Sequence, residues 1–263
     1  MNLFTKIFGS IALSTILVAC GGGGSDDSIT APSNFNTALY NNAWDKALVY
    51  KPYTSTPILL KDLGDHAPAP VAISLHGCDG VQEYNRSGGD KYFPILLAMQ
   101  GYLVIEPDSY YGMKFGPGSN LCYTDPKTNT TIWPSVSVVA DRAFDAEYAI
   151  NKVKDSKFWD QKNLLVQGQS QGFYLVEWLR PKYTSIVTKW LFSGYSTCFQ
   201  NRYDFTNAKP TLIINSDADS SVNCTDYIQR AYPNVSIRLI KGNYHVPIWS
   251  SEGYEIVKNW VKL

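Results

Sequence analysis

Several features that would point to metal or nucleic-acid chemistry are scarce or missing in this chain of 263 residues. It has three histidines, and no two of its five cysteines have the C-x-x-C spacing of common zinc sites. The formal net charge is zero, and no block of Lys or Arg stands out. We therefore expect no metal or organic cofactor and no electrostatic binding to nucleic acid.

A long apolar segment is missing as well. Residues 7–19 form a short apolar run, too brief to span a bilayer comfortably, and one positive charge precedes it. This pattern is typical of a secretory signal. Because small residues lead directly into Cys20, the segment resembles the bacterial lipobox, in which the thiol is diacylated and the signal is cleaved before it. The alternative is a plain signal peptide or a short membrane anchor.

The lipobox resemblance implies an exported bacterial lipoprotein, anchored by lipidated Cys20 to a cell membrane at the periplasmic face or the cell surface. Residues 1–19 are then a signal peptide, and residues 20–35 are a lipidated cysteine with a flexible Gly/Ser tether. Residues 36–263 are expected to form one domain, because the chain is 44% hydrophobic and long enough to bury a substantial core.

Apolar runs of strand length alternate with helical patterns along this domain. The alternation predicts an α/β fold: a doubly wound, mostly parallel sheet with helices on both faces and no large cap domain. Strands are expected at residues 47–50, 70–75, 101–106, 164–167, 188–192, 211–214 and 236–240, and helices at residues 91–100, 138–154, 174–179 and 252–262. The Gly/Pro/Asn-rich segment 107–135 is expected to be a loop at the rim of the site.

Residues 168–172 read Gly-Gln-Ser-Gln-Gly and match the G-x-S-x-G motif. A predicted strand precedes them and a predicted helix follows. The segment resembles the nucleophile elbow of the α/β-hydrolases, in which the serine stands on a strained strand-to-helix turn that flanking glycines permit. We therefore predict that Ser170 is a nucleophile. The alternative is an ordinary glycine-flanked turn.

A serine hydroxyl needs a base to remove its proton during attack, and histidine is the usual base near neutral pH. His66 lies in a Pro-flanked loop, and His76 lies in a turn after an early strand, where it reads as a packed structural residue. His245 follows the last predicted strand and is C-terminal to Ser170, so we predict it as the base.

A carboxylate must orient the imidazole of the base. Between the predicted nucleophile and the predicted base, Asp217 and Asp219 are the acids that directly follow a predicted strand, and the order Ser, Asp, His is then complete. Residues 219–222 resemble the D-x-x-V segment that carries the acid in many hydrolases of this fold. We therefore favour Asp219 and assign Asp217 a role in shaping the turn.

Acyl transfer also needs N–H donors for the oxyanion of the tetrahedral intermediate. The amide of Gln171, directly after the nucleophile, is the first predicted donor. The second donor normally comes from the loop after an early strand, where the Cys78 amide is the candidate.

Three segments together resemble the dienelactone hydrolase family of α/β-hydrolases: residues 75–80 (Leu-His-Gly-Cys-Asp-Gly), residues 107–110 (Pro-Asp-Ser-Tyr) with Cys122 downstream, and residues 168–172. The resemblance covers essentially the whole chain from about Val49 onward. True members of that family carry a cysteine nucleophile, whereas this chain has Ser170. The difference favours a serine hydrolase of wider ester scope.

The four cysteines other than Cys20 are an even number in an oxidising compartment, which indicates two disulfides. Their placement also looks like that of secreted members of the family. Of the three possible pairings we expect Cys78–Cys122 and Cys198–Cys224, because each pair flanks neighbouring βα loops.

The sequence thus predicts an exported serine hydrolase that cleaves a carboxylic ester, on a small molecule or a polymer, through an acyl-enzyme and a Ser170–Asp219–His245 triad. Two alternatives stay open. A peptidase or amidase could use the same triad, and a surface-binding lipoprotein could keep the scaffold without activity.

Overall fold

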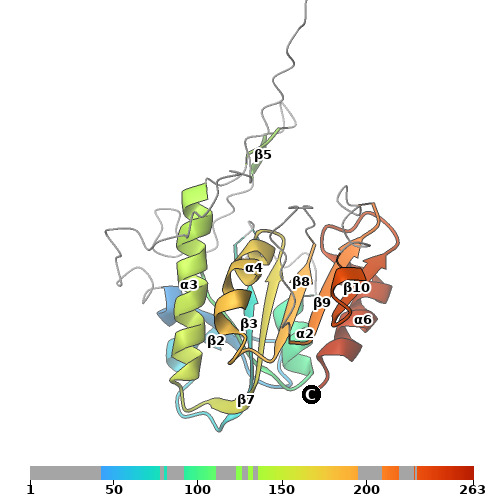
Figure 1. Cartoon of the computed structure of the whole chain (residues 1–263). Coiled ribbons are helices and arrows are strands. Elements are labelled where there is room, and N and C mark those ends of the chain that lie inside the picture. Colours follow the sequence, from blue (N-terminus) through green and yellow to red (C-terminus); the bar gives the residue numbers. More distant parts are fainter. Residues whose placement is uncertain are drawn as a thin grey trace, which may run out of the picture. The chain divides into compact units, whose positions relative to one another are not determined.

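A mostly parallel sheet organises the computed structural model (Figure 1). The structure describes residues 43–77, 80–81, 92–110, 123–125, 130–132, 136–194, 209–218, 228 and 230–263. Within these residues eight strands form one sheet in the order β10-β9-β8-β7-β3-β4-β1-β2, and all of them belong to one compact unit. The strands from β10 to β4 run parallel, whereas β1 pairs antiparallel with both β4 and β2 at one edge.

The elements follow the expected alternation along the chain. The sheet strands are β1 (Leu48–Tyr50), β2 (Ile58–Leu59), β3 (Ala69–Leu75), β4 (Leu103–Glu106), β7 (Trp159–Gln169), β8 (Lys189–Ser193), β9 (Thr211–Ser216) and β10 (Val235–Ile240). The helices are α2 (Phe93–Met99), α3 (Val136–Lys154), α4 (Gln171–Tyr183) and α6 (Ser251–Val261), with 3₁₀ helices η1 (Leu60–Asp62) and η4 (Pro247–Trp249). The predicted α/β architecture is confirmed.

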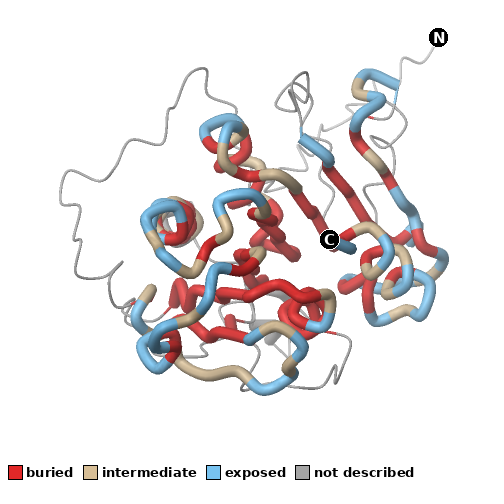
Figure 2. The backbone as a smooth tube through the Cα atoms, turned by 90° about the horizontal axis from the view of Figure 1, so that it is seen from below, coloured by how far each residue is buried: buried red, intermediate tan, exposed pale blue. Residues whose placement is uncertain are grey.

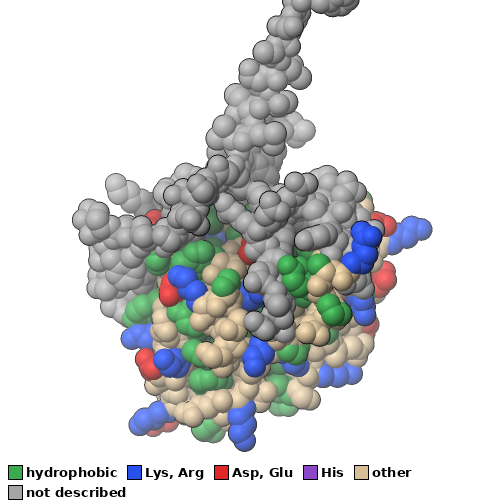
Figure 3. All heavy atoms as spheres, viewed as in Figure 1, with side chains coloured by type: hydrophobic (Ala, Val, Ile, Leu, Met, Phe, Trp, Pro, Cys, Tyr) green, Lys and Arg blue, Asp and Glu red, His purple; other side chains and the backbone are tan. Residues whose placement is uncertain are grey.

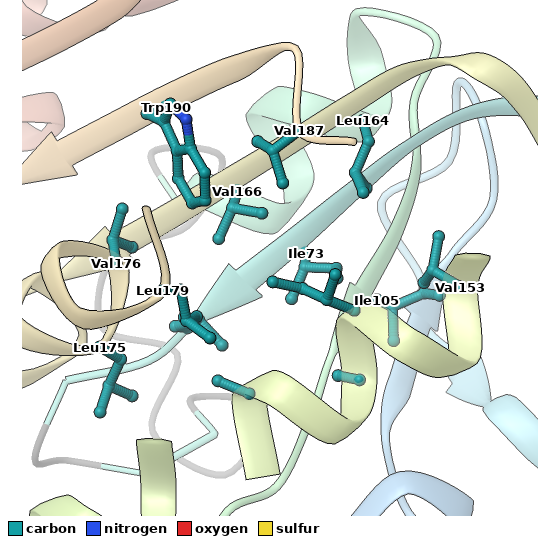
Figure 4. Packing of buried hydrophobic residues seen from close by; sticks show 14 of the residues in the cluster. Ile73, Ile105, Val153, Leu164, Val166, Leu175, Val176, Leu179, Val187 and Trp190 are labelled. Atoms are coloured by element: carbon teal, nitrogen blue, oxygen red, sulfur yellow. The ribbon is translucent and has the colours of Figure 1, made fainter. Parts of the chain in front are cut away.

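Helices cover both faces of the sheet and bury two apolar cores (Figure 2). Successive residues of a strand point to opposite faces, so a strand buried on both sides must be apolar throughout. On β7, Val166 joins the core under α3 and α4, whereas Leu165 joins the core under α2 and α6. Figure 4 shows the first core, in which Val166 packs near Leu179 of α4 and Trp190 of β8.

The segment 107–135, predicted as a loop, contains a hairpin instead. Strands β5 (Tyr123–Asp125) and β6 (Thr130–Ile132) pair antiparallel across four intervening residues. The polar composition of this segment hides its strands, because a hairpin outside the main sheet lacks the buried apolar run that marks the other strands.

Strand β7 also begins earlier than predicted. It starts at Trp159, which pairs with Ala69, and the register of β3 against β7 shifts between Ala69 and Val71. Gln161 has a φ of +58° within this irregular stretch. An irregular stretch of this kind interrupts the apolar pattern, so the sequence reveals only the regular part of the strand.

The surface carries charges of both signs. In Figure 3 the Lys/Arg and Asp/Glu side chains of the described residues are interspersed, in agreement with the net charge of zero. Across the described part of the chain, none of the helices has both the length and the apolar character that a bilayer span requires.

Candidate active site

Ser170 stands on the sharp turn between β7 and α4, as the sequence predicts. Its backbone has φ +53° and ψ −118°, a conformation that non-glycine residues rarely adopt and that costs on the order of 1–3 kcal/mol. The turn is held from both sides, because the Ser170 N–H donates to the Ser193 carbonyl (2.9 Å) and the Ser170 carbonyl accepts from the Phe173 N–H (2.9 Å). The fold therefore stabilises a strained serine at the carboxyl end of the central strand.

The two motif glycines are required by close backbone contacts. A Cβ on Gly168 would lie 2.1 Å from the carbonyl oxygen of Gly172. A Cβ on Gly172 would lie 2.1 Å from the carbonyl oxygen of Leu75, at the end of β3. Any side chain at either position would push α4 away from the sheet. The glycines are thus needed to avoid Cβ clashes, as predicted. A left-handed backbone is not the reason, because neither glycine has a positive φ.

His245 reaches the predicted nucleophile from the loop after β10. Its Nε2 lies 2.8 Å from the Ser170 Oγ, within hydrogen-bond reach. Two contacts with strand ends place this loop: the Ser216 Oγ accepts from the Tyr244 N–H (3.3 Å), and Gly194 lies directly against the His245 carbonyl. The structure thus brings together the predicted nucleophile and base, which are 75 residues apart in sequence.

Of the two acid candidates, Asp217 is among the described residues and Asp219 is not. The Asp217 Oδ1 accepts from the Gly242 N–H (2.8 Å), and the Asp217 N–H donates to the Ile240 carbonyl (2.9 Å). These bonds tie the turn after β9 to the end of β10, which is the role that we assigned to Asp217. Asp219 as the triad acid stays a prediction.

Of the two predicted oxyanion donors, Gln171 is among the described residues and Cys78 is not. Gln171 is the first residue of α4, so its N–H is one of those that a helix leaves without an intrahelical partner. The loop after β3 passes beside the nucleophile, since a Cβ on Gly77 would lie 3.2 Å from the Ser170 Cβ and 3.7 Å from its Oγ. Cys78 lies outside the described residues, as do Cys20, Cys122, Cys198 and Cys224. Among the described residues, no group of three or more His, Cys, Asp or Glu could hold a metal ion.

Solved structures share this architecture. Est1E from Butyrivibrio proteoclasticus matches with a TM-score of 0.52 and 14% identity, over 82% of this chain and 90% of that one. A dienelactone hydrolase-like promiscuous phosphotriesterase from metagenomic libraries matches with a TM-score of 0.50 and 11% identity, over 82% and 98%. An esterase from Pyrococcus furiosus matches with a TM-score of 0.50 and 13% identity, over 74% and 83%.

The chain has the α/β-hydrolase fold. No protein-family model and no curated protein matches the sequence. At these identities the likeness concerns the fold alone, so the α/β-hydrolase fold sets where a site would lie, and the chemistry must be argued from the side chains.

Behind the nucleophile of this α/β-hydrolase fold lies a buried polar network that the sequence did not reveal. At its centre is Arg142 of α3, whose side chain is fully buried (0% exposed). Its guanidinium donates to the His76 carbonyl and to the Gln171 Oε1, and its Nε donates to the Ser109 Oγ (3.3 Å). The hydroxyl of Tyr110 also donates to the Gln171 Oε1 (2.9 Å).

His76 is a buried member of this network, as its structural interpretation predicted. Its Nδ1 lies 2.7 Å from the Gly77 carbonyl, which a proton on Nδ1 satisfies, and its Nε2 lies 3.2 Å from the Ser109 Oγ. Burial, and to a smaller degree the charge of Arg142, holds the pKa of His76 well below its ordinary value of 6.5. His76 is therefore neutral at physiological pH.

Proposed function

We propose that this protein is a serine hydrolase that cleaves a carboxylic ester through an acyl-enzyme intermediate. The observation that carries the proposal is the 2.8 Å contact between the Ser170 Oγ and the His245 Nε2, made from a strained turn at the carboxyl end of the central strand. In a doubly wound sheet this is the edge where ligands bind. A base within hydrogen-bond reach of a serine hydroxyl is the arrangement that makes the hydroxyl nucleophilic.

In the proposed mechanism the Ser170 Oγ attacks the ester carbonyl carbon while the His245 Nε2 takes the hydroxyl proton. The tetrahedral intermediate collapses, the bond to the alkoxide breaks, and protonated His245 returns the proton to the leaving alcohol. His245 then deprotonates a water molecule, which attacks the acyl-enzyme. This second tetrahedral intermediate collapses, the bond between the acyl carbon and the Ser170 Oγ breaks, and His245 returns the proton to that oxygen. The products are the acid and free Ser170.

The other roles belong to the same proposal. Asp219 orients His245, and the backbone amides of Gln171 and Cys78 hold the oxyanion. The proposed subtype is dienelactone hydrolase-like, with a serine nucleophile favouring an ester scope wider than dienelactones. A dienelactone hydrolase-like structure of the same fold, described as a promiscuous phosphotriesterase, is compatible with a broad scope.

We further propose that the protein is an exported lipoprotein held at a membrane by lipidated Cys20, with two disulfides. The support is the sequence of residues 1–28 and the even number of remaining cysteines. Replacing Cys20 by Ser should release the protein from the membrane fraction without changing its specific activity, because the Gly/Ser tether separates the anchor from the domain. A fully processed Cys20→Ser protein that stays with the membrane would contradict the lipid anchor.

A fluorophosphonate probe and a panel of p-nitrophenyl esters of increasing chain length test the hydrolase proposal. We expect labelling of the wild-type protein at Ser170, no labelling of Ser170→Ala, and turnover of at least the short esters. Aminoacyl anilides are assayed beside the esters, and a preference for them would make the protein a peptidase or amidase. If the folded wild-type protein is not labelled and turns over no ester or anilide, the proposal is wrong and the protein is a binding scaffold.

A further inference from the structure

Arg142 connects two segments that are expected to form opposite walls of the oxyanion hole. One side of its guanidinium donates to the carbonyl of His76, two residues before Cys78. The other side donates to the side chain of Gln171, the residue directly after the nucleophile. A guanidinium is a planar fork with donors at fixed angles, so it sets the separation and orientation of the two groups that it joins.

We propose that Arg142 is a positioning residue that holds the oxyanion hole of the hydrolase in its productive geometry. The inference rests on the proposed function, because it assigns the role to the loop after β3 and to the first residue of α4. Both carry the amides expected to stabilise the oxyanion. Such amides act only when they are fixed at hydrogen-bond distance before charge develops, so a group that fixes both at once contributes to the transition state without touching it.

The surroundings of Arg142 are those of a positioned cation rather than of an ordinary buried ion pair. Among the described residues its hydrogen-bond partners are uncharged: backbone carbonyl, amide and hydroxyl groups. The Tyr110 ring lies under the guanidinium, with its centroid 5.0 Å from the Cζ. Burying a charge in this way is unfavourable for the fold, and a packed apolar side chain often stabilises a core as well or better. A role in the site explains why the charge is retained.

Two acidic residues lie near Arg142. Asp145, one turn further along α3, and Asp108, after β4, are the acids whose charges act on the guanidinium. Burial raises the pKa of Asp145 well above its ordinary value, although Arg142 acts in the opposite direction. With a raised pKa, Asp145 loses its charge at a higher pH than an ordinary aspartate does, and below that pH it no longer offsets the charge of Arg142.

Steady-state kinetics of Arg142→Gln and Arg142→Lys on p-nitrophenyl acetate test the inference. Arg142→Gln should lower kcat by about 10²-fold, as the loss of one oxyanion donor does, with KM changed by less than about threefold. Arg142→Lys keeps the charge but not the fork, and kcat should fall by an intermediate factor of about ten.

A transition-state analogue separates positioning from simple folding. Inhibition by a trifluoromethyl ketone, which forms a tetrahedral oxyanion on the serine, should weaken by the same factor by which kcat/KM falls. The matched control is Arg180→Lys, because Arg180 is also a buried arginine (4% exposed) but lies near the far end of α4. That variant should keep kcat and the inhibition constant within about twofold.

Each outcome decides between the alternatives. A folded Arg142→Gln that keeps kcat within twofold overturns the inference, as does a rise in KM with unchanged kcat. If Arg142→Gln does not fold, Arg142→Lys decides by the same criteria, and failure of both to fold would assign Arg142 to the core alone. A wild-type protein without turnover or labelling would overturn the proposed function, whereas a normal wild type beside unaffected variants would overturn only the role of Arg142.

Discussion

Gly194, directly after β8, lies so close to His245 that a Cβ at position 194 would stand 2.1 Å from the His245 carbonyl oxygen. The predicted base is therefore located from a neighbouring strand as well as from its own loop. Gly194 also has a φ of +69°, which a residue with a side chain adopts only with strain.

Gly194→Ala should lower kcat by about 10²-fold. The added methyl displaces the His245 loop, and a displacement of the catalytic imidazole by about 1 Å is enough for a loss of this size. The control is Gly64→Ala. Gly64 has a similar φ of +63°, but a Cβ there would meet nothing within 4 Å. Gly64→Ala should lose about 1–2 kcal/mol of stability from the left-handed backbone. Gly194→Ala should lose more, because the clash adds to the same backbone strain, and urea unfolding measures both losses. Equal kcat values for the two variants would show that the contact with His245 has no role.

Ser170→Ala and His245→Ala should each lower kcat by about 10⁴-fold or more, with thermal midpoints close to that of the wild type. The double variant should be no slower than the slower single variant, since a nucleophile and its base act as one unit. Multiplicative losses in the double variant would indicate that the two residues act independently.

Asp219→Asn and Asp217→Ala should separate the acid from the turn residue. Losing the acid that orients the base lowers kcat by about 10⁴-fold by analogy with other triads, so we expect this of Asp219→Asn, with little change in stability. Asp217→Ala removes the acceptor of the Gly242 N–H and should cost about 1 kcal/mol with near-normal kcat. An active Asp219→Asn beside a stable, inactive Asp217→Ala would reverse the assignment.

His76 should make the fold sensitive to acid. Its folded-state pKa lies well below 6.5, so below that pH the unfolded chain binds a proton that the folded chain does not. Stability should then fall as pH falls, by up to about 1.4 kcal/mol per pH unit from this group. Asp145 acts in the opposite sense, because its raised pKa favours the folded state at low pH.

The measurement for His76 is the pH dependence of urea unfolding between pH 7.5 and 5, compared with His76→Gln. Since Asp145 titrates in both proteins, the difference in slope isolates the histidine. We expect a shallower slope for His76→Gln, and parallel curves would mean that the imidazole is protonated as easily in the folded state as in the unfolded state.

The disulfide prediction concerns Cys78–Cys122 and Cys198–Cys224. Each bridge closes a loop of a few tens of residues and should stabilise the oxidised protein by about 3 kcal/mol. Peptide mapping without reduction decides the pairing, and a Cys78–Cys198 peptide would contradict it. Unfolding with and without reductant gives the size of the effect.

The sheet and the Ser170–His245 pair could be predicted from the sequence because both follow strong local signals. Buried parallel strands are short apolar runs, and functional residues of such sheets follow the strands directly, which limits the candidates to few positions. The β5–β6 hairpin has no buried apolar run and therefore gave no signal. The sequence pattern does not mark the start of β7, because the register against β3 shifts there.

Arg142 shows a different limit of sequence reasoning. A charged residue on a helix is usually solvated, and its neighbours Asp141 and Asp145 make the local sequence look like an exposed face. Its spacing is the signal that the sequence offers for burial. Arg142 is four residues before Ala146 and eight before Ile150, so the three share one helix face, and both apolar residues are buried. Whether a cation on such a stripe is buried depends on acceptors from the loops after β3 and β4 and from α4, which only the folded chain brings together.

The strained backbone at Ser170 has a consequence for how this scaffold can change over time. At φ +53° a glycine would relieve steric strain that serine cannot avoid, so the fold by itself favours glycine at this position. The proposed catalytic role gives a reason for serine at this position. In relatives that have turned to binding alone, position 170 should therefore drift toward glycine before the surrounding strands lose their pattern, and the residue found there becomes a record of whether a lineage still uses the chemistry.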